Sequence, residues 1–172
     1  RSTVATYSGV LDDLRRAFAG TTDAKRRGLR MGAFSYNTGS LRCPTCDGTG
    51  QISLDVQFLP DVDIPCPDCH GSRYAPEAWD VRRHTTRNAA GEKDGYVSLP
   101  ELMEMTVDRA LGRVGSLRKA KRKLRTLADL GLGYLTLGEA TPALSGGEAQ
   151  RLKLSTDLGR DQHGTVFVLD EP

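Results

Sequence analysis

The chain has 172 residues, of which 38% are hydrophobic, 27% charged and only 6% aromatic, and its formal net charge is +2. This composition is typical of a globular protein with one aliphatic core or two small lobes. No apolar run approaches the roughly 20 residues of a membrane-spanning helix, and no signal peptide follows Arg1. With so small a net charge, nucleic-acid binding would need a local basic patch.

The first predicted helix covers about residues 10–18, because apolar residues recur there at helical spacing. Ser8 is its predicted N-cap and Gly20 its predicted end. Residues 23–37 are basic, contain glycine and show no clear period, so we expect a connector there.

The next segment, residues 41–75, contains all four cysteines of the chain as two C-x2-C pairs. Between the pairs, apolar and polar residues alternate from Ile52 to Phe58, turn at Pro60 and Asp61, and alternate again to Ile64. An alternation of period two predicts strands. The module is therefore predicted to be a hairpin clamped by a metal that binds Cys43, Cys46, Cys66 and Cys69.

The predicted metal is Zn²⁺, since two C-x2-C pairs at this separation are typical of four-thiolate zinc sites. Gly48 and Gly71 each lie two positions after a pair, where backbone amides can turn toward the thiolates. Four thiolates leave no open coordination position, so the zinc is predicted to be structural and His70 a surface residue. Paired cysteines without secretory context also favour metal over disulfides and predict a cytoplasmic protein.

After the module, residues 82–97 are polar and predict an exposed loop. Ser98 and Glu101 then form a capping-box pattern with Pro100 in the first turn. Helical character continues to about Leu130, with expected breaks near Gly112 and Gly115. The apolar stripe of the last helical part consists of Ala120, Leu124 and Leu127.

A dense basic cluster lies on the same stretch of sequence as that stripe, and no acidic residue occurs between residues 113 and 125. Its residues are Arg113, Arg118, Lys119, Lys121, Arg122, Lys123 and Arg125. The cluster is either an ordinary solvated helix face or a surface that binds the phosphates of DNA. Contacts of the second kind would be to the backbone rather than to bases.

Residues 144–151 read Leu-Ser-Gly-Gly-Glu-Ala-Gln-Arg, and a predicted helix follows to about Leu158. Ser145 can cap that helix, and Gly146 and Gly147 let backbone amides approach an anion closely. An ordinary capped loop would also explain so short a string. However, the apolar strand predicted at 165–169 ends in Asp170 and Glu171, as in a Walker B motif. Together the two motifs resemble an ABC-type ATPase signature followed by Walker B.

The phosphate-binding half of such a site has no counterpart in the sequence, because no G-x-x-x-x-G-K-[ST] motif occurs. His163 precedes the predicted strand and cannot act as the switch histidine that follows Walker B in ABC ATPases. We therefore expect the chain to be a piece of a longer protein, and to hydrolyse no ATP by itself.

Further motifs are Thr6-Tyr7-Ser8-Gly9-Val10, Cys43-Pro44-Thr45-Cys46-Asp47-Gly48, Phe58-Leu59-Pro60-Asp61, Pro65-Cys66, Gly71-Ser72-Arg73-Tyr74, Met105-Thr106-Val107 and Leu130-Gly131-Leu132-Gly133-Tyr134. With them, nearly the whole chain resembles UvrA, the excinuclease A subunit, in its second nucleotide-binding half. The resemblance implies an α+β fold: a helical signature subdomain with an inserted four-cysteine zinc hairpin and a short terminal piece of the ATPase α/β core. The implied divisions are 1–40 after the Q-loop, 41–75 for zinc, 76–160 for the helical subdomain and 161–172 for Walker B.

The resemblance also implies roles for individual residues. Ser145, Gly146, Gly147, Glu148 and Gln150 would bind ATP held by the other nucleotide-binding half, and Asp170 would hold Mg²⁺ through water. Glu171 would be the catalytic base. The implied partners are DNA, the second nucleotide-binding half, a second copy of the protein and the B subunit, in the damage-recognition step of nucleotide excision repair.

Two alternatives stay open at this point. The 82–97 loop and the stretch 157–161 depart from the pattern of the repair proteins, which allows a UvrA-like paralogue in drug or antibiotic resistance. The first cysteine pair also resembles the zinc-ribbon modules of J-domain co-chaperones. Those modules leave the signature and the acidic pair without an explanation.

Overall fold

The structure is a computed structural model that describes residues 2–54, 62–85 and 95–158. The predicted strand at 165–169, Asp170, Glu171 and the predicted turn at Pro60 and Asp61 lie outside these ranges. Within them the chain is mostly helical with two antiparallel ladders, which confirms the α+β class. None of the helices in the described ranges is both long and apolar enough to cross a bilayer.

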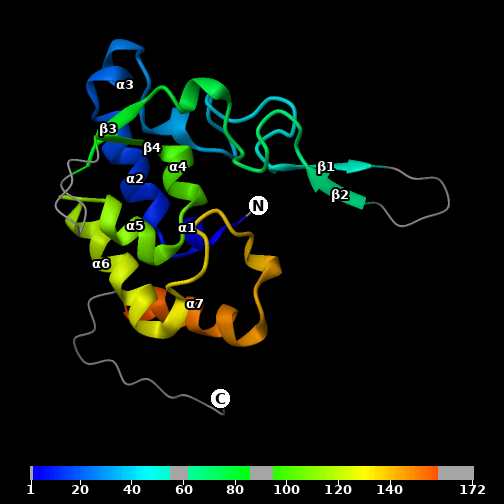
Figure 1. Ribbon diagram of the computed structural model, residues 1–172, viewed down its shortest axis with the longest axis vertical. Coiled ribbons are helices and arrows are strands. Elements are labelled where there is room, and N and C mark those ends of the chain that lie inside the picture. The colour runs from blue at the N-terminus through cyan, green and yellow to red at the C-terminus, as the bar shows by residue number, and fades with distance from the viewer. Residues whose placement is uncertain (1, 55–61, 86–94, 159–172) are drawn as a thin grey trace.

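The helices form one lobe, from which a strand pair projects (Figure 1). The α-helices are α1 (Val4–Tyr7), α2 (Val10–Ala19), α3 (Thr22–Arg26), α4 (Leu99–Glu104), α5 (Val107–Arg113), α6 (Arg118–Leu127) and α7 (Gly146–Leu158). Shorter turns are η1 (Met31–Phe34), η2 (Pro76–Ala78), the π-type η3 (Ala128–Leu132) and η4 (Thr141–Ala143).

Helices α2 and α6 pack together within the core of the lobe. The predicted stripe on α6 is confirmed, since Ala120, Leu124 and Leu127 are fully buried. They share one apolar cluster with Leu14 and Phe18 of α2. Helix α6 therefore presents one face to the core and the rest of its circumference, which is basic, to the outside.

Two expectations about the first segment are wrong. Ser8 does not cap α2: its hydroxyl donates to the Val4 carbonyl at 2.7 Å, and Gly9, with a positive φ of 70°, is the N-cap. The expected connector at 23–37 contains α3 and η1. Short helices of this kind depend on tertiary contacts rather than on a periodic pattern.

The predicted hairpin of the cysteine module is present in the described residues. Strands β1 (Gln51–Leu54) and β2 (Val62–Pro65) pair antiparallel, with Ile52 opposite Ile64. The strands extend away from the helical lobe (Figure 1).

The first and last residues of the loop expected at 82–97 belong instead to two strands that pair with each other. Strands β3 (Arg82–His84) and β4 (Tyr96–Ser98) pair antiparallel, and Val97 is buried. The alternation was too short to be recognised in the sequence. The capping box at Ser98 is confirmed, because the Glu101 amide donates to the Ser98 hydroxyl and the Ser98 amide donates to the Glu101 carboxylate.

The predicted long helix is divided near Gly115, as expected, but not at Gly112, and it has a further break that was not expected. It breaks first at Met105, and again between α5 and α6, where Gly115 has a positive φ of 59°. Gly112 lies inside α5. At this break the backbone between α4 and α5 pairs with the segment after η3. The Leu137 amide donates to the Met105 carbonyl, and Thr106 forms an antiparallel bridge with Thr136.

Candidate functional site

The four cysteines form one buried cluster. All their sulfur atoms lie within 4.8 Å of one another, with Cys43 and Cys66 at 3.9 Å and Cys46 and Cys69 at 3.6 Å. In a tetrahedral zinc site with Zn–S bonds of 2.3 Å, sulfur atoms stand about 3.8 Å apart. The cysteines are therefore positioned to bind a metal ion, and their type and spacing fit zinc.

Each pair is followed by two residues in the left-handed region, Asp47 and Gly48 in the first pair and His70 and Gly71 in the second. This geometry turns amides toward the sulfur atoms, and the Gly50 amide donates to Cys46 Sγ at 3.3 Å. Burial would raise the pKa of the Cys46 thiol, but the amides of Gly50 and Gly48 and the Cys69 thiol lower it to about 7. Burial raises the pKa of the Cys43 and Cys69 thiols, so Cys46 is the most readily ionised of these three.

Glycine is required at position 48 for a second reason. A Cβ there would lie 1.7 Å from the Tyr36 carbonyl oxygen, so no larger residue fits. His70 is exposed, as expected of a residue that is not a ligand.

The cysteine module is fixed to the lobe at its base. The backbone amide of Cys43 donates to the Arg73 carbonyl at 2.9 Å, and the buried Tyr74 hydroxyl donates to the Phe34 carbonyl at 2.9 Å. The Arg73 guanidinium lies over the Tyr36 ring, 5.3 Å from its centroid. Arg42, at the other side of the module, pairs with Asp47 at 2.8 Å, so both arginines that flank the cysteines have intramolecular partners.

The signature segment begins α7 with a reciprocal cap. The Glu148 amide donates to the Ser145 hydroxyl at 3.3 Å, and the Ser145 amide donates to the Glu148 carboxylate at 2.7 Å. The predicted capping role of Ser145 is confirmed. Gly146 and Gly147, the first two residues of the helix, are exposed.

A further contact at this helix start was not predicted. The Tyr134 hydroxyl donates to the Glu148 carboxylate, and this bond raises the pKa of the tyrosine and lowers that of the glutamate. Arg151 donates to the Gly147 carbonyl and to the Leu130 carbonyl, at 3.3 and 3.2 Å. The segment at 130–134 therefore supports the first turn of α7. The sequence analysis used the motif at 130–134 only for the family resemblance, and nothing in the motif indicates a contact between Tyr134 and Glu148.

The basic cluster is divided by the fold. Five of its members on α6 are exposed: Arg118, Lys119, Lys121, Arg122 and Arg125. Lys123 instead donates to the Asp13 carboxylate at 2.7 Å and to the Gly9 carbonyl at 2.8 Å, so it joins α6 to α2. Arg113 lies on α5 and is half-buried.

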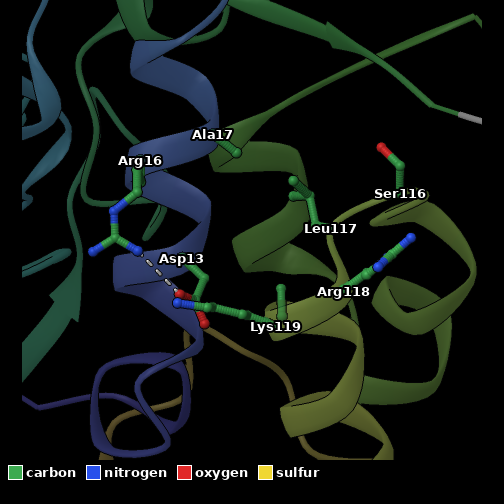
Figure 2. A pocket seen from close by; sticks show the side chains of 8 residues that line it. Asp13, Arg16, Ala17, Ser116, Leu117, Arg118 and Lys119 are labelled. Carbon is green, nitrogen blue, oxygen red and sulfur yellow. Dashed lines mark hydrogen bonds and ion pairs between the residues drawn. The ribbon is translucent and has the colours of Figure 1, made fainter.

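The start of α6 carries no acidic residue in its first turn, although carboxylates are favourable at helix N-termini. Arg118 and Lys119 lie there, beside a pocket of about 380 Å³ between α2 and α6. Figure 2 shows Asp13 and Arg16 of α2 across this pocket from Leu117 and Lys119. The outer part of α6 is therefore a positively charged surface.

The comparisons with known proteins point in one direction, although no family model matches the chain. The whole chain is 46% identical to UvrABC system protein A of Bacillus subtilis and 45% identical to that of Streptococcus pyogenes. It spans 17% of the length of each of these relatives. The crystal structure of UvrA2 from Deinococcus radiodurans matches 92% of the chain and 18% of its own length, with a TM-score of 0.77 and 42% identity.

Proposed function

Because this chain belongs to the UvrA family over the segment that it covers, we propose that it is the signature subdomain of a UvrA-type ABC ATPase that binds DNA in nucleotide excision repair. The proposed divisions are the start of the subdomain at 1–40, the zinc module at 41–75, the helical part at 76–160 and the Walker B strand at 161–172. In this proposal the zinc is structural and the subdomain works with a second nucleotide-binding half.

The observation that carries the proposal is the open first turn of α7. Neither Gly146 nor Gly147 has a positive φ, and a Cβ at either position would meet nothing within 4 Å. The fold itself thus does not require glycine there. Glycine is required there if an external anion approaches the backbone amides closely, and the N-terminal end of a helix attracts such an anion.

The proposed anion is the γ-phosphate of ATP bound by the other nucleotide-binding half. Ser145, Gly146, Gly147 and Glu148 would face it, with Gln150 nearby on the same helix. Asp170 would hold Mg²⁺ through water, and Glu171 would polarise the attacking water. Because the phosphate-binding motif is absent from these 172 residues, the chain alone should not hydrolyse ATP. Measurable turnover by the purified chain would contradict this assignment.

The proposed DNA surface is the exposed side of α6, at Arg118, Lys119, Lys121, Arg122 and Arg125. Lys123 is left out because Asp13 and Gly9 already bind it. The ion pairs within the part of the chain that the structure describes include none of these five cations. Cations that bind phosphates release counterions, so affinity should fall steeply with salt.

A double variant tests this surface. Lys121→Gln with Arg122→Gln should weaken binding of a duplex oligonucleotide and reduce the slope of log affinity against log salt by about 2. The matched control, Arg109→Gln with Lys153→Gln, removes the same charge from exposed positions on α5 and α7. Equal effects of the two double variants, or an unchanged slope in the first, would reject α6 as the DNA surface.

A further inference from the structure

A second surface with exposed basic residues lies where α3 faces the β3–β4 ladder (Figure 1). The two elements enclose a pocket of about 560 Å³. Its lining residues are Thr21, Thr22, Asp23, Arg82, Arg83, His84 and Tyr96. None of them belongs to the basic cluster on α6 or to the signature.

An exposed aromatic ring stands at this pocket. Tyr96 is 58% exposed, and its ring packs edge-on against His84 with a centroid distance of 5.4 Å and an interplanar angle of 88°. An edge contact fixes the orientation of the tyrosine and leaves ring surface for a second planar group.

Among the described residues that line the pocket, two are arginines and one is an aspartate. Asp23 and Asp80 are occupied, because Arg26 and Arg27 pair with them at 3.2 and 3.6 Å. Arg82 of β3 lines the pocket and is exposed, and the ion pairs of the described residues provide no carboxylate for it.

The pocket is also joined to the start of α6. Arg83 of β3 donates to the Val114 carbonyl at 3.5 Å and to the Ser116 hydroxyl at 3.2 Å. Ser116 lines the pocket beside Arg118 and Lys119 that is drawn in Figure 2. The ladder is therefore held next to the proposed DNA surface, and one strand of nucleic acid could contact both.

We propose that this pocket is a second nucleic-acid site, which takes an unpaired DNA base by stacking on Tyr96 and an adjacent phosphate at Arg82. An aromatic ring flanked by cations is the usual platform for single-stranded nucleic acid, whereas a base inside a duplex has no free face. The choice of DNA rests on the function proposed above. The preference for an unpaired base rests on Tyr96 alone.

The test measures binding of a fluorescent single-stranded oligonucleotide and of its duplex to the 172-residue chain. Tyr96→Ala should weaken single-strand binding about tenfold, because stacking on one aromatic ring is worth about 1–3 kcal/mol. It should leave the salt slope and duplex binding unchanged, since the phenol is uncharged. Tyr96→Phe keeps the ring and should bind as the original chain does.

A phosphate contact at Arg82 is tested separately. Arg82→Gln should reduce the salt slope for the single strand by about 0.7. Zinc content and the helical circular dichroism signal show that each variant is folded.

Each outcome separates the two proposals. If the variant Lys121→Gln with Arg122→Gln weakens single-strand binding and Tyr96→Ala does not, the second site is rejected and the function stands. If Tyr96→Ala and Tyr96→Phe weaken binding equally, the contact is not stacking and the proposal also fails. If Tyr96→Ala weakens single-strand binding while the α6 variant binds duplex normally, the second site stands and the α6 surface is rejected. If the chain binds neither oligonucleotide, both proposals fail.

Discussion

The projecting hairpin and the helical lobe are stabilised by different means. At the hairpin, the cluster of buried hydrophobic residues consists of the four cysteines, with Ile52 partly buried against them. Leu54 and Val62 are exposed. The lobe instead has one continuous apolar core, to which each α-helix of the described residues contributes buried side chains. The hairpin needs a metal because it buries little apolar surface, whereas the helices of the lobe need none because they pack on a shared core.

Removal of the metal should give the largest difference between the hairpin and the lobe. Structural zinc contributes on the order of 10 kcal/mol to folding of small modules. Cys66→Ser, or a strong chelator, should therefore remove amide-exchange protection from β1 and β2 while α2 and α6 stay protected. His70→Ser, beside Cys69 but exposed, is the control and should retain one zinc per chain. Protected hairpin amides in metal-free protein would contradict the comparison.

The same truncation in both regions gives the next largest difference. Leu124→Ala on α6 removes a fully buried side chain and should lower the free energy of unfolding by about 3 kcal/mol. Leu54→Ala on β1 truncates a side chain that is 42% exposed and should cost about 0.5 kcal/mol or less. Urea denaturation followed by circular dichroism measures both. Equal costs would mean that the hairpin buries Leu54 against something else.

Within the lobe, burial should also separate two neighbouring carboxylates. Asp13 is 10% exposed and binds Lys123, whereas Asp12 is 62% exposed and binds Arg15 at 3.0 Å. Asp13→Asn should cost about 2 kcal/mol, because it leaves a half-buried ammonium without its counter-charge. Asp12→Asn should cost less than about 0.5 kcal/mol. If thermal unfolding of the two variants is indistinguishable, Lys123 is better counted with the DNA surface.

The smallest expected effect concerns the cap of α4. Ser98→Ala removes the acceptor of the Glu101 amide and should cost about 1 kcal/mol. Ser98→Thr keeps a hydroxyl acceptor and should restore most of that loss. Zinc binding should be unchanged in both variants, since the cap belongs to the lobe. A loss of zinc in Ser98→Ala would show that the two regions are more tightly coupled than their separate cores suggest.

Local chemistry was the predictable part of this molecule. The metal cluster, the hairpin strands, the stripe on α6 and the two caps at Ser98 and Ser145 each follow from a few adjacent residues. The β3–β4 ladder was missed because each strand contributes only three residues, which is too few for a visible alternation. Ser8 was misassigned because both Ser8 and Gly9 can precede a helix, and the contact of Ser8 with Val4 belongs to the turn before.

The sequence by itself therefore determined which atoms can bind metal, which glycines precede the signature helix and which helix is basic. Spacing along the chain decides these, since the groups involved are a few residues apart. Only the tertiary structure decided that Lys123 serves Asp13, that Tyr134 supports Glu148, and that α3 and β3 share a pocket. Those pairs join separate elements of the fold, and no local period records which elements will pack together.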